Sequence, residues 1–172
     1  MKIILSSIIY FLFLVNTLAD TGKKISNYPN FIPPSSKSYF LQHNGNEVLQ
    51  VKVVDQPGDL AKGFSGIREE QVEDHQGLFF WFKETSPKSF WMPDTYFDLA
   101  IIYLGQDLKV LELVRDAPHH IGYSEKVEPI YRAPLVKSRY VLEIKASSPL
   151  AKIINKGDQF RWVKDHPHSK QK

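Results

Sequence analysis

The chain has 172 residues, a formal net charge of +3 and no cysteine. Without cysteine it can form neither disulfides nor a cysteine-ligated zinc or iron–sulfur site. Its basic residues are dispersed rather than gathered on one face, which argues against nucleic-acid binding, so we expect no nucleic-acid partner.

Residues 1–19 have the pattern of a secretory signal peptide. Lys2 precedes an apolar run from Ile3 to Val15, and Ala19 provides a small residue at the cleavage position. The apolar run is shorter than the roughly 20 residues that a membrane-spanning helix needs. We therefore predict cleavage after Ala19 and a periplasmic or secreted protein. The alternative is an uncleaved segment, and only through this segment would the protein be tethered to a membrane.

The rest of the chain divides into a linker, one domain and a tail. Residues 20–38 are rich in proline, serine, asparagine and lysine and show little periodicity, which predicts a flexible linker. We predict a single β domain over residues 39–164 and a disordered tail over residues 165–172.

The domain begins with a predicted β-hairpin that turns at Asn44-Gly45, a strong hairpin signal. The alternating apolar positions of its second arm indicate a half-buried strand. A short helix is predicted over residues 57–62, and Gly63 can end it. Two aromatic strands follow, GLFFWF at 77–82 and SFWM at 89–92, joined through KETSPK.

The second half of the domain is predicted to hold the central strand. DLAIIYL at 98–104 is apolar throughout, which fits a strand covered on both faces, and LKVLELV at 108–114 is a further strand. The proline-containing segment 115–138 is a long irregular loop, which in a compact domain is either functional or mobile. A strand over 139–146, a short helix from Pro149 to Asn155 and a strand over 158–163 complete the chain.

These elements predict a mainly β fold, a sandwich or barrel with two or three short helices. Six motifs support a family resemblance: KGFSG at 62–66, GLFFWF at 77–82, FWMPDT at 90–95, DLAIIYL at 98–104, YVLE at 140–143 and GDQF at 157–160. Together, over about residues 48–163, they resemble the Domain of Unknown Function 192 family of small exported or membrane-tethered prokaryotic proteins. The resemblance implies a compact, jelly-roll-like β domain, and the family has no established activity.

The chain departs from the family pattern at two places. Ile67 stands where the family usually has a basic residue, and Pro93-Asp94 replace its usual Lys-Asn pair. If the Lys-Asn pair held an anionic ligand, this chain should bind that ligand poorly or not at all.

The segment FWMPDT has two interpretations that the sequence leaves open. In the first, Trp91 and Met92 belong to the core and Pro93 ends a strand. In the second, Trp91 forms the wall of a pocket and Asp94 and Thr95 form its polar rim, because pockets combine apolar walls with a few polar groups.

Three carboxylates, Asp94, Asp98 and Glu143, are candidates for acid–base chemistry. Two carboxylates can act as acid and base only if the fold sets their separation and splits their pKa values. The structural alternatives are a turn residue for Asp94, a strand-entry residue for Asp98 and an ion pair for Glu143. The arginines available as ion-pair partners are Arg68, Arg132 and Arg139.

Histidine and serine patterns do not indicate a metal site or a nucleophile. His119-His120 and His166-Pro167-His168 match no metalloprotease motif, and we interpret them as exposed loop and tail residues. The spacing around Ser65 fails the nucleophile-elbow pattern of hydrolases. No metal and no cofactor are expected.

We interpret the chain as an exported, non-catalytic ligand-binding or accessory module of the cell envelope. Its candidate ligand-binding residues are Trp91, Asp94, Thr95, Asp98 and Glu143. Two neighbouring carboxylates would favour a neutral, hydroxyl-rich ligand such as an envelope glycan. The alternative is a hydrolase of envelope polymers acting through Asp94, Asp98 or Glu143. A third possibility is an assembly partner engaged through residues 116–138, and the oligomeric state stays open.

Overall fold

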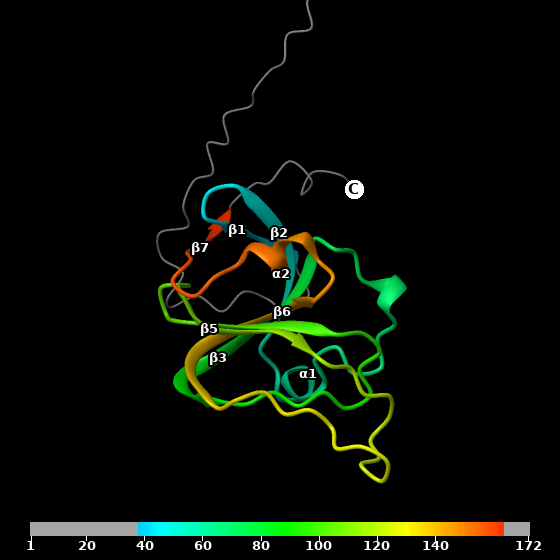
Figure 1. The fold of residues 1–172 in the computed structure, drawn as a ribbon. Helices are drawn as coiled ribbons and strands as arrows, with labels where there is room; N and C mark the ends of the chain where they lie inside the picture. Colours follow the sequence, from blue (N-terminus) through cyan, green and yellow to red (C-terminus); the bar gives the residue numbers. More distant parts are fainter. Residues whose placement is uncertain (1–37, 164–172) are drawn as a thin grey trace, which may run out of the picture.

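A computed structural model describes residues 38–163, which form one curled β-sheet with short helices (Figure 1). The strands are β1 (Ser38–His43), β2 (Glu47–Val54), β3 (Gln76–Lys88), β4 (Leu99–Leu104), β5 (Val110–Ala117), β6 (Val136–Lys145) and β7 (Phe160–Val163). The helices are α1 (Pro57–Lys62), the short 3-10 helix η2 (Glu69–Gln71) and α2 (Pro149–Ile153). The predicted signal peptide, the linker up to residue 37 and the tail lie outside the described residues. No helix in the described range is long and apolar enough to cross a membrane.

The seven strands follow the order β5-β4-β6-β3-β2-β1-β7. Neighbours are antiparallel except β2 and β3, which are parallel. The sheet curls into a half-barrel, and its two edge strands meet at one end, where the N–H of Phe160 donates to the carbonyl of Leu108 at 3.1 Å. The mainly β prediction is confirmed. The described strands form a single sheet, and a jelly-roll arrangement is not shown.

Local signals predicted the hairpin and both α-helices. The β1–β2 hairpin turns at Asn44 and Gly45, whose φ values of 45° and 84° lie in the left-handed region that these residue types tolerate. Helix α1 covers residues 57–62 as predicted, with proline in its first turn. Helix α2 starts at Pro149 as predicted but ends at Ile153, two residues before the predicted end.

Of the two aromatic strands predicted to be joined through residues 83–88, the first is confirmed as part of β3, whereas the second, over residues 89–92, is wrong. Strand β3 runs from Gln76 to Lys88, and its register with β6 shifts between Trp81 and Ser86. Extra residues on one strand form a bulge that bends the strand without ending it. The segment 89–98 is consequently not a sheet strand, and it contacts the loop 118–135 through isolated bridges.

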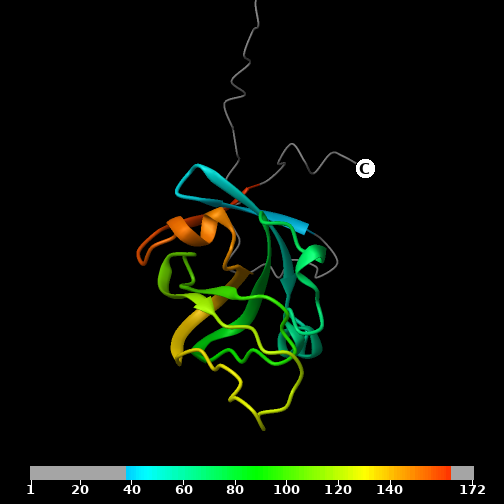
Figure 2. The same cartoon turned by 45° about the vertical axis from the view of Figure 1, so that its right-hand side comes forward.

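Two apolar clusters lie on opposite faces of the sheet. The first takes residues from all seven strands and from α2, including Phe79, Leu142 and Trp162. The second contains Phe80 and Ile101 of the sheet and is covered by residues from α1, from segment 89–98 and from loop 118–135. Loop 118–135 (yellow) extends at the end of the sheet opposite β1 and β7, near α1 (Figure 1 and Figure 2).

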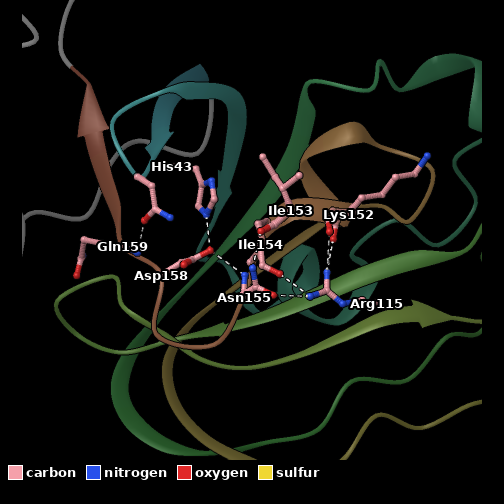
Figure 3. Close-up of polar contacts among 10 residues, drawn as sticks. His43, Arg115, Lys152, Ile153, Ile154, Asn155, Asp158 and Gln159 are labelled. Atoms are coloured by element: carbon pink, nitrogen blue, oxygen red, sulfur yellow. Dashed lines mark hydrogen bonds and ion pairs between the residues drawn. The ribbon is translucent and has the colours of Figure 1, made fainter.

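Polar contacts fix the end of α2 against the sheet (Figure 3). The two terminal nitrogens of Arg115 in β5 donate to the carbonyls of Ala151 and Ile154, each at 2.7 Å. The last carbonyls of a helix have no partner within the helix, so Arg115 satisfies two of these acceptors. Beside them, Nε2 of His43 lies 2.7 Å from Oδ2 of Asp158, which connects β1 to the segment before β7.

Candidate functional site

A cleft of about 470 Å³ opens on the second apolar face of the sheet. Residues 60–65 at the end of α1 form one wall, the end of β3 and residues 89–93 form another, and Glu143 of β6 forms the floor. This volume falls within the range of small-molecule pockets, which are mostly apolar and hold a few directed polar groups. Of the sequence-predicted site residues, Trp91, Thr95 and Glu143 line the cleft, whereas Asp94 and Asp98 do not.

Glu143 is a buried carboxyl in apolar surroundings. Strand β6 lies between β3 and β4, and Glu143 is paired in register with Leu78 and Ile101, both members of the second apolar cluster. The residue is 4% exposed. Within the described range 38–163 its carboxyl has no hydrogen bond or ion pair, and its oxygens border the cleft rather than being fully enclosed in the core. A buried polar group without a partner costs free energy, so this side chain does not serve to stabilise the free fold.

The structural alternative for Glu143, an ion pair with a lysine or arginine, is wrong for the described residues. The neighbours of Glu143 across the sheet are aliphatic, because β6 is a central strand whose partners on both sides belong to the apolar cluster. The guanidinium groups have other partners, which are Tyr96 for Arg68, Glu125 for Arg132 and Tyr140 for Arg139.

Burial determines the protonation state of Glu143. Removal from water disfavours the charged form, which raises the pKa of the carboxyl from 4.5 to about 8. The carboxyl is therefore mainly protonated near neutral pH and can donate a hydrogen bond as well as accept one. It can also take up or release a proton close to neutral pH, as a general acid or base must.

Gly63 forms the part of the cleft wall next to this carboxyl and has no side chain to fill the space there. A Cβ at this position would lie 3.4 Å from Oε2 of Glu143 and 3.3 Å from Cζ of Phe80. The φ of Gly63 is +51°, in the left-handed region that favours glycine. The sequence predicted this glycine only as the end of α1, and the structure places it directly against the buried carboxyl.

Trp91 lies at the mouth of the cleft and is 47% exposed. The interpretation of Trp91 as a core residue is therefore wrong, whereas Met92, at 1% exposure, is a core residue. Trp91 forms an isolated bridge with Arg132 of the long loop, whose guanidinium carbon lies 5.2 Å from the ring centroid, and it meets the ring of Tyr123 edge-on. The backbone at Trp91 thus pairs with the exposed loop instead of the sheet, and the indole faces solvent.

Asp94 is a turn residue that fixes the long loop. Its φ is 48°, in the left-handed region that aspartate tolerates better than most residues. Its N–H donates to the carbonyl of Gly122 at 2.7 Å, and its Oδ1 accepts the N–H of Gly122 at 3.2 Å. Its carbonyl accepts the N–H of Gly66 at 2.8 Å. Thr95 is 3% exposed, and its hydroxyl donates to the carbonyl of Pro93.

Asp98 is bonded to His119 at the start of the long loop. Its Oδ1 accepts the N–H of His119 at 2.8 Å and lies 2.7 Å from the ring Nδ1. Partial burial acts to raise the pKa of Asp98, but the hydrogen bonds from His119 outweigh it and lower the pKa. Asp98 thus binds the start of the long loop, and among the described residues Glu143 is the one carboxyl that lines the cleft.

The histidines of the described range contact side chains or backbone groups of the protein itself. His120 is buried, and its Nε2 lies 2.9 Å from the carbonyl of Ser124 within the long loop. No group of three or more metal-ligating side chains within residues 38–163 is placed to hold a metal ion. His166 and His168 lie outside the described residues.

Sequence reasoning missed two lysines and one serine of the cleft. Lys62 lines it and is exposed, and its side-chain ammonium has no ion-pair or hydrogen-bond partner within the described chain. Lys88 lines it with its Nζ 4.4 Å from the ring centroid of Phe82, and burial together with the charge of Arg139 lowers its pKa. The hydroxyl of Ser65 donates to the carbonyl of Pro93 at 2.9 Å. The available signal was the segment KGFSG, which contains Lys62 and Ser65.

Comparisons with known proteins identify the fold. The family model described as "DUF192: Uncharacterized ACR, COG1430" matches residues 39–162. The crystal structure of a putative transcription regulator from Sinorhizobium meliloti is similar, with a TM-score of 0.59, 22% identity, and coverage of 76% of this chain and 98% of that one. The crystal structure of a protein of unknown function from Novosphingobium aromaticivorans is also similar, with a TM-score of 0.57, 23% identity, and coverage of 77% of this chain and 91% of that one. At this identity the likeness shows the fold alone. No curated protein matches the chain.

Proposed function

We propose that this chain, which belongs to the DUF192 family, binds one small polar ligand in the cleft above Glu143. The observation that carries the proposal is the buried carboxyl without a partner. A carboxyl at 4% exposure, among aliphatic neighbours, lowers the stability of the free protein. A ligand group that hydrogen-bonds this carboxyl would offset that cost only in the complex.

The shape and lining of the cleft support binding of a small molecule. Trp91 offers an exposed aromatic face at the mouth, and Phe80 and Met92 supply apolar walls. Lys62 supplies a charge at the rim that has no partner within the described chain. A ligand with an apolar face and several polar groups would satisfy all of these features.

Binding is better supported than two-carboxylate hydrolysis. Acid–base hydrolysis of this kind needs a second carboxyl within roughly 5–10 Å of the first, on the opposite side of the bond that is cleaved. Asp94 and Asp98, the two sequence candidates for that role, hold the loop 118–135 and do not line the cleft. The sequence of residues 1–19 supports placing this binding module outside the cytoplasm, as an accessory protein of the cell envelope.

NMR titration of the 15N-labelled protein tests the proposal. The ligands would be a panel of neutral monosaccharides, amino sugars and sugar acids, each at millimolar concentration. We expect at least one class to shift the amide signals of Gly63 and Ser65 and the indole signal of Trp91, which all belong to the cleft. Glu143→Leu should abolish the shifts, whereas Glu47→Gln, at an exposed site on β2, should not. The absence of shifts with every class would contradict the proposal.

A second candidate function is supported by the exposed apolar side chains of the long loop. Its exposed residues include Ile121 at 66%, Val127 at 97% and Leu135 at 70%. Exposed apolar side chains that are close together can mark a protein interface. Light scattering of the wild type and of a Val127→Ser, Leu135→Ser double variant tests whether the loop joins copies of the chain. A mass that is monomeric and equal for both proteins over a wide concentration range would contradict self-association.

A further inference from the structure

The charges of the cleft are the opposite of those predicted from the sequence. The predicted groove was acidic because it included Asp94 and Asp98, and neither residue lines the cleft. Within residues 38–163, the ionisable side chains that do line it are Lys62, Lys88 and Glu143. Because Glu143 is buried away from water, its neutral form prevails near neutral pH, so the cleft carries a net positive charge. A ligand with one negative charge is therefore favoured over a neutral or cationic ligand.

The two lysines differ in their availability to a ligand. The Nζ of Lys88 already contacts the hydroxyl and the carbonyl of Ser86 and lies over the ring of Phe82. Lys62 is exposed, and its side-chain ammonium has neither an ion pair nor a hydrogen bond within the described residues. Lys62 is thus the cation that a ligand anion would meet at the rim. It immediately precedes Gly63, the residue of the cleft wall that lies next to the Glu143 carboxyl.

The aromatic group at the mouth indicates the shape of the ligand body. Trp91 is 47% exposed, whereas the other tryptophans, Trp81 and Trp162, are 3% and 5% exposed. The C–H face of a sugar ring is apolar and flat enough to pack on an indole, and its hydroxyls then point sideways to polar groups. Tryptophan suits such sites because it combines a large apolar surface with rigidity.

We infer that the ligand is a sugar acid or a closely similar hydroxylated carboxylate. Its carboxylate pairs with Lys62, one hydroxyl bonds the carboxyl of Glu143, and its ring packs on Trp91. This inference rests on the proposed function of the cleft and adds the chemical class of the ligand. It replaces the neutral glycan expected from the sequence, because the carboxylates on which that expectation depended lie outside the cleft.

The protonation of Glu143 should control the affinity. Among the described residues, the other ionisable groups that line the cleft are Lys62 of α1 and Lys88 of β3, and Tyr103 of β4 lies close enough for the charge of Glu143 to affect its pKa. Burial raises the pKa of Tyr103, which therefore stays neutral at moderately alkaline pH. Since the pKa of Glu143 is about 8, its carboxyl ionises above that pH. The ionised form repels a carboxylate, so the sugar acid should be released as the pH rises.

Calorimetric or NMR titration with D-glucuronate and D-glucose tests the inference. At about pH 6.5 we expect glucuronate to bind roughly three- to tenfold more tightly than glucose, the range of one exposed charge pair combined with a hydrogen bond. Lys62→Gln should remove this preference for glucuronate over glucose. Lys137→Gln is the matched control, since Lys137 is exposed and lies outside the cleft. The affinity for glucuronate should fall up to about tenfold between pH 6.5 and pH 9, and Glu143→Gln should abolish this dependence.

The outcomes separate the inference from the proposed function. Equal binding of glucose and glucuronate, unaffected by Lys62→Gln, would overturn the sugar-acid inference and leave ligand binding in the cleft intact. Tighter binding of glucose 6-phosphate than of glucuronate, lost in Lys62→Gln, would also overturn it, in favour of a phosphate ligand. The absence of binding of all three, together with no NMR shifts from the wider panel, would overturn both proposals.

Discussion

Glu143→Gln should stabilise the protein by an amount that grows with pH. The pKa of the Glu143 carboxyl is 4.5 when exposed and about 8 in the fold, because burial disfavours the charged form. Below pH 4.5 the folded and unfolded states both hold the proton, so stability is at its full value. Between pH 4.5 and 8 the unfolded state releases the proton and the folded state keeps it. Stability is therefore lost as the pH rises through this window.

The size of the effect follows from the pKa difference. Each pH unit within the window costs about 1.4 kcal/mol, so the wild type loses about 3 kcal/mol between pH 4.5 and 7 from this residue alone. Glutamine has a similar shape and does not titrate. The difference in the free energy of unfolding between Glu143→Gln and the wild type should grow by the same amount, while contributions from all other groups cancel.

Urea denaturation at several pH values measures this difference. The control is Glu47→Gln, at an exposed position on β2. Its free energy of unfolding relative to the wild type should not rise between pH 4.5 and 8. A difference between Glu143→Gln and the wild type that stays constant between pH 4.5 and 8 would refute the reasoning. It would mean that the carboxyl is solvated or has a partner in solution.

Three further predictions concern other parts of the molecule. Trp91→Ala should lower the free energy of unfolding by less than about 1.5 kcal/mol, because the Trp91 ring is half-exposed. Trp162→Ala should lower it by about 3–5 kcal/mol, because the Trp162 ring is buried, and denaturant melts of both variants measure the difference. Arg115→Met should cost about 1–3 kcal/mol and speed amide exchange around α2, because two carbonyls at the helix end lose a charged donor. The mature protein should begin at Asp20, and an intact Met1 in the membrane fraction, found by mass spectrometry, would show an anchor instead.

The parts of the fold that depend on local signals could be predicted from the sequence. The hairpin at Asn44-Gly45, the proline-initiated helices and the apolar strand β4 are specified by residues next to each other in the chain. The continuity of β3 could not be predicted this way. Whether residues 82–85 form a turn or a bulge depends on their pairing with β6, which lies more than fifty residues further along the chain.

The candidate site was predicted only in part, for the same reason. Glu143 was a sequence candidate and lines the cleft, but whether an arginine meets it depends on the strands on either side of β6, and these place aliphatic residues there. Asp94 and Asp98 were grouped with it because of their chemistry and spacing. Asp94 and Asp98 instead accept hydrogen bonds from Gly122 and His119 of the long loop. Sequence spacing does not reveal that these two segments lie side by side.

The central claim is that Glu143 is a buried carboxyl that a ligand engages, and the carbon-13 NMR signal of its carboxyl tests this most directly. A pH titration of selectively labelled protein gives the pKa of this group in the free state and with saturating D-glucuronate or another ligand from the panel. The account predicts a pKa near 8 in the free protein and a further rise when a sugar acid binds, because a carboxylate beside Glu143 disfavours its ionisation. A free pKa near 4.5, or a signal that no ligand of the panel displaces, would contradict the account.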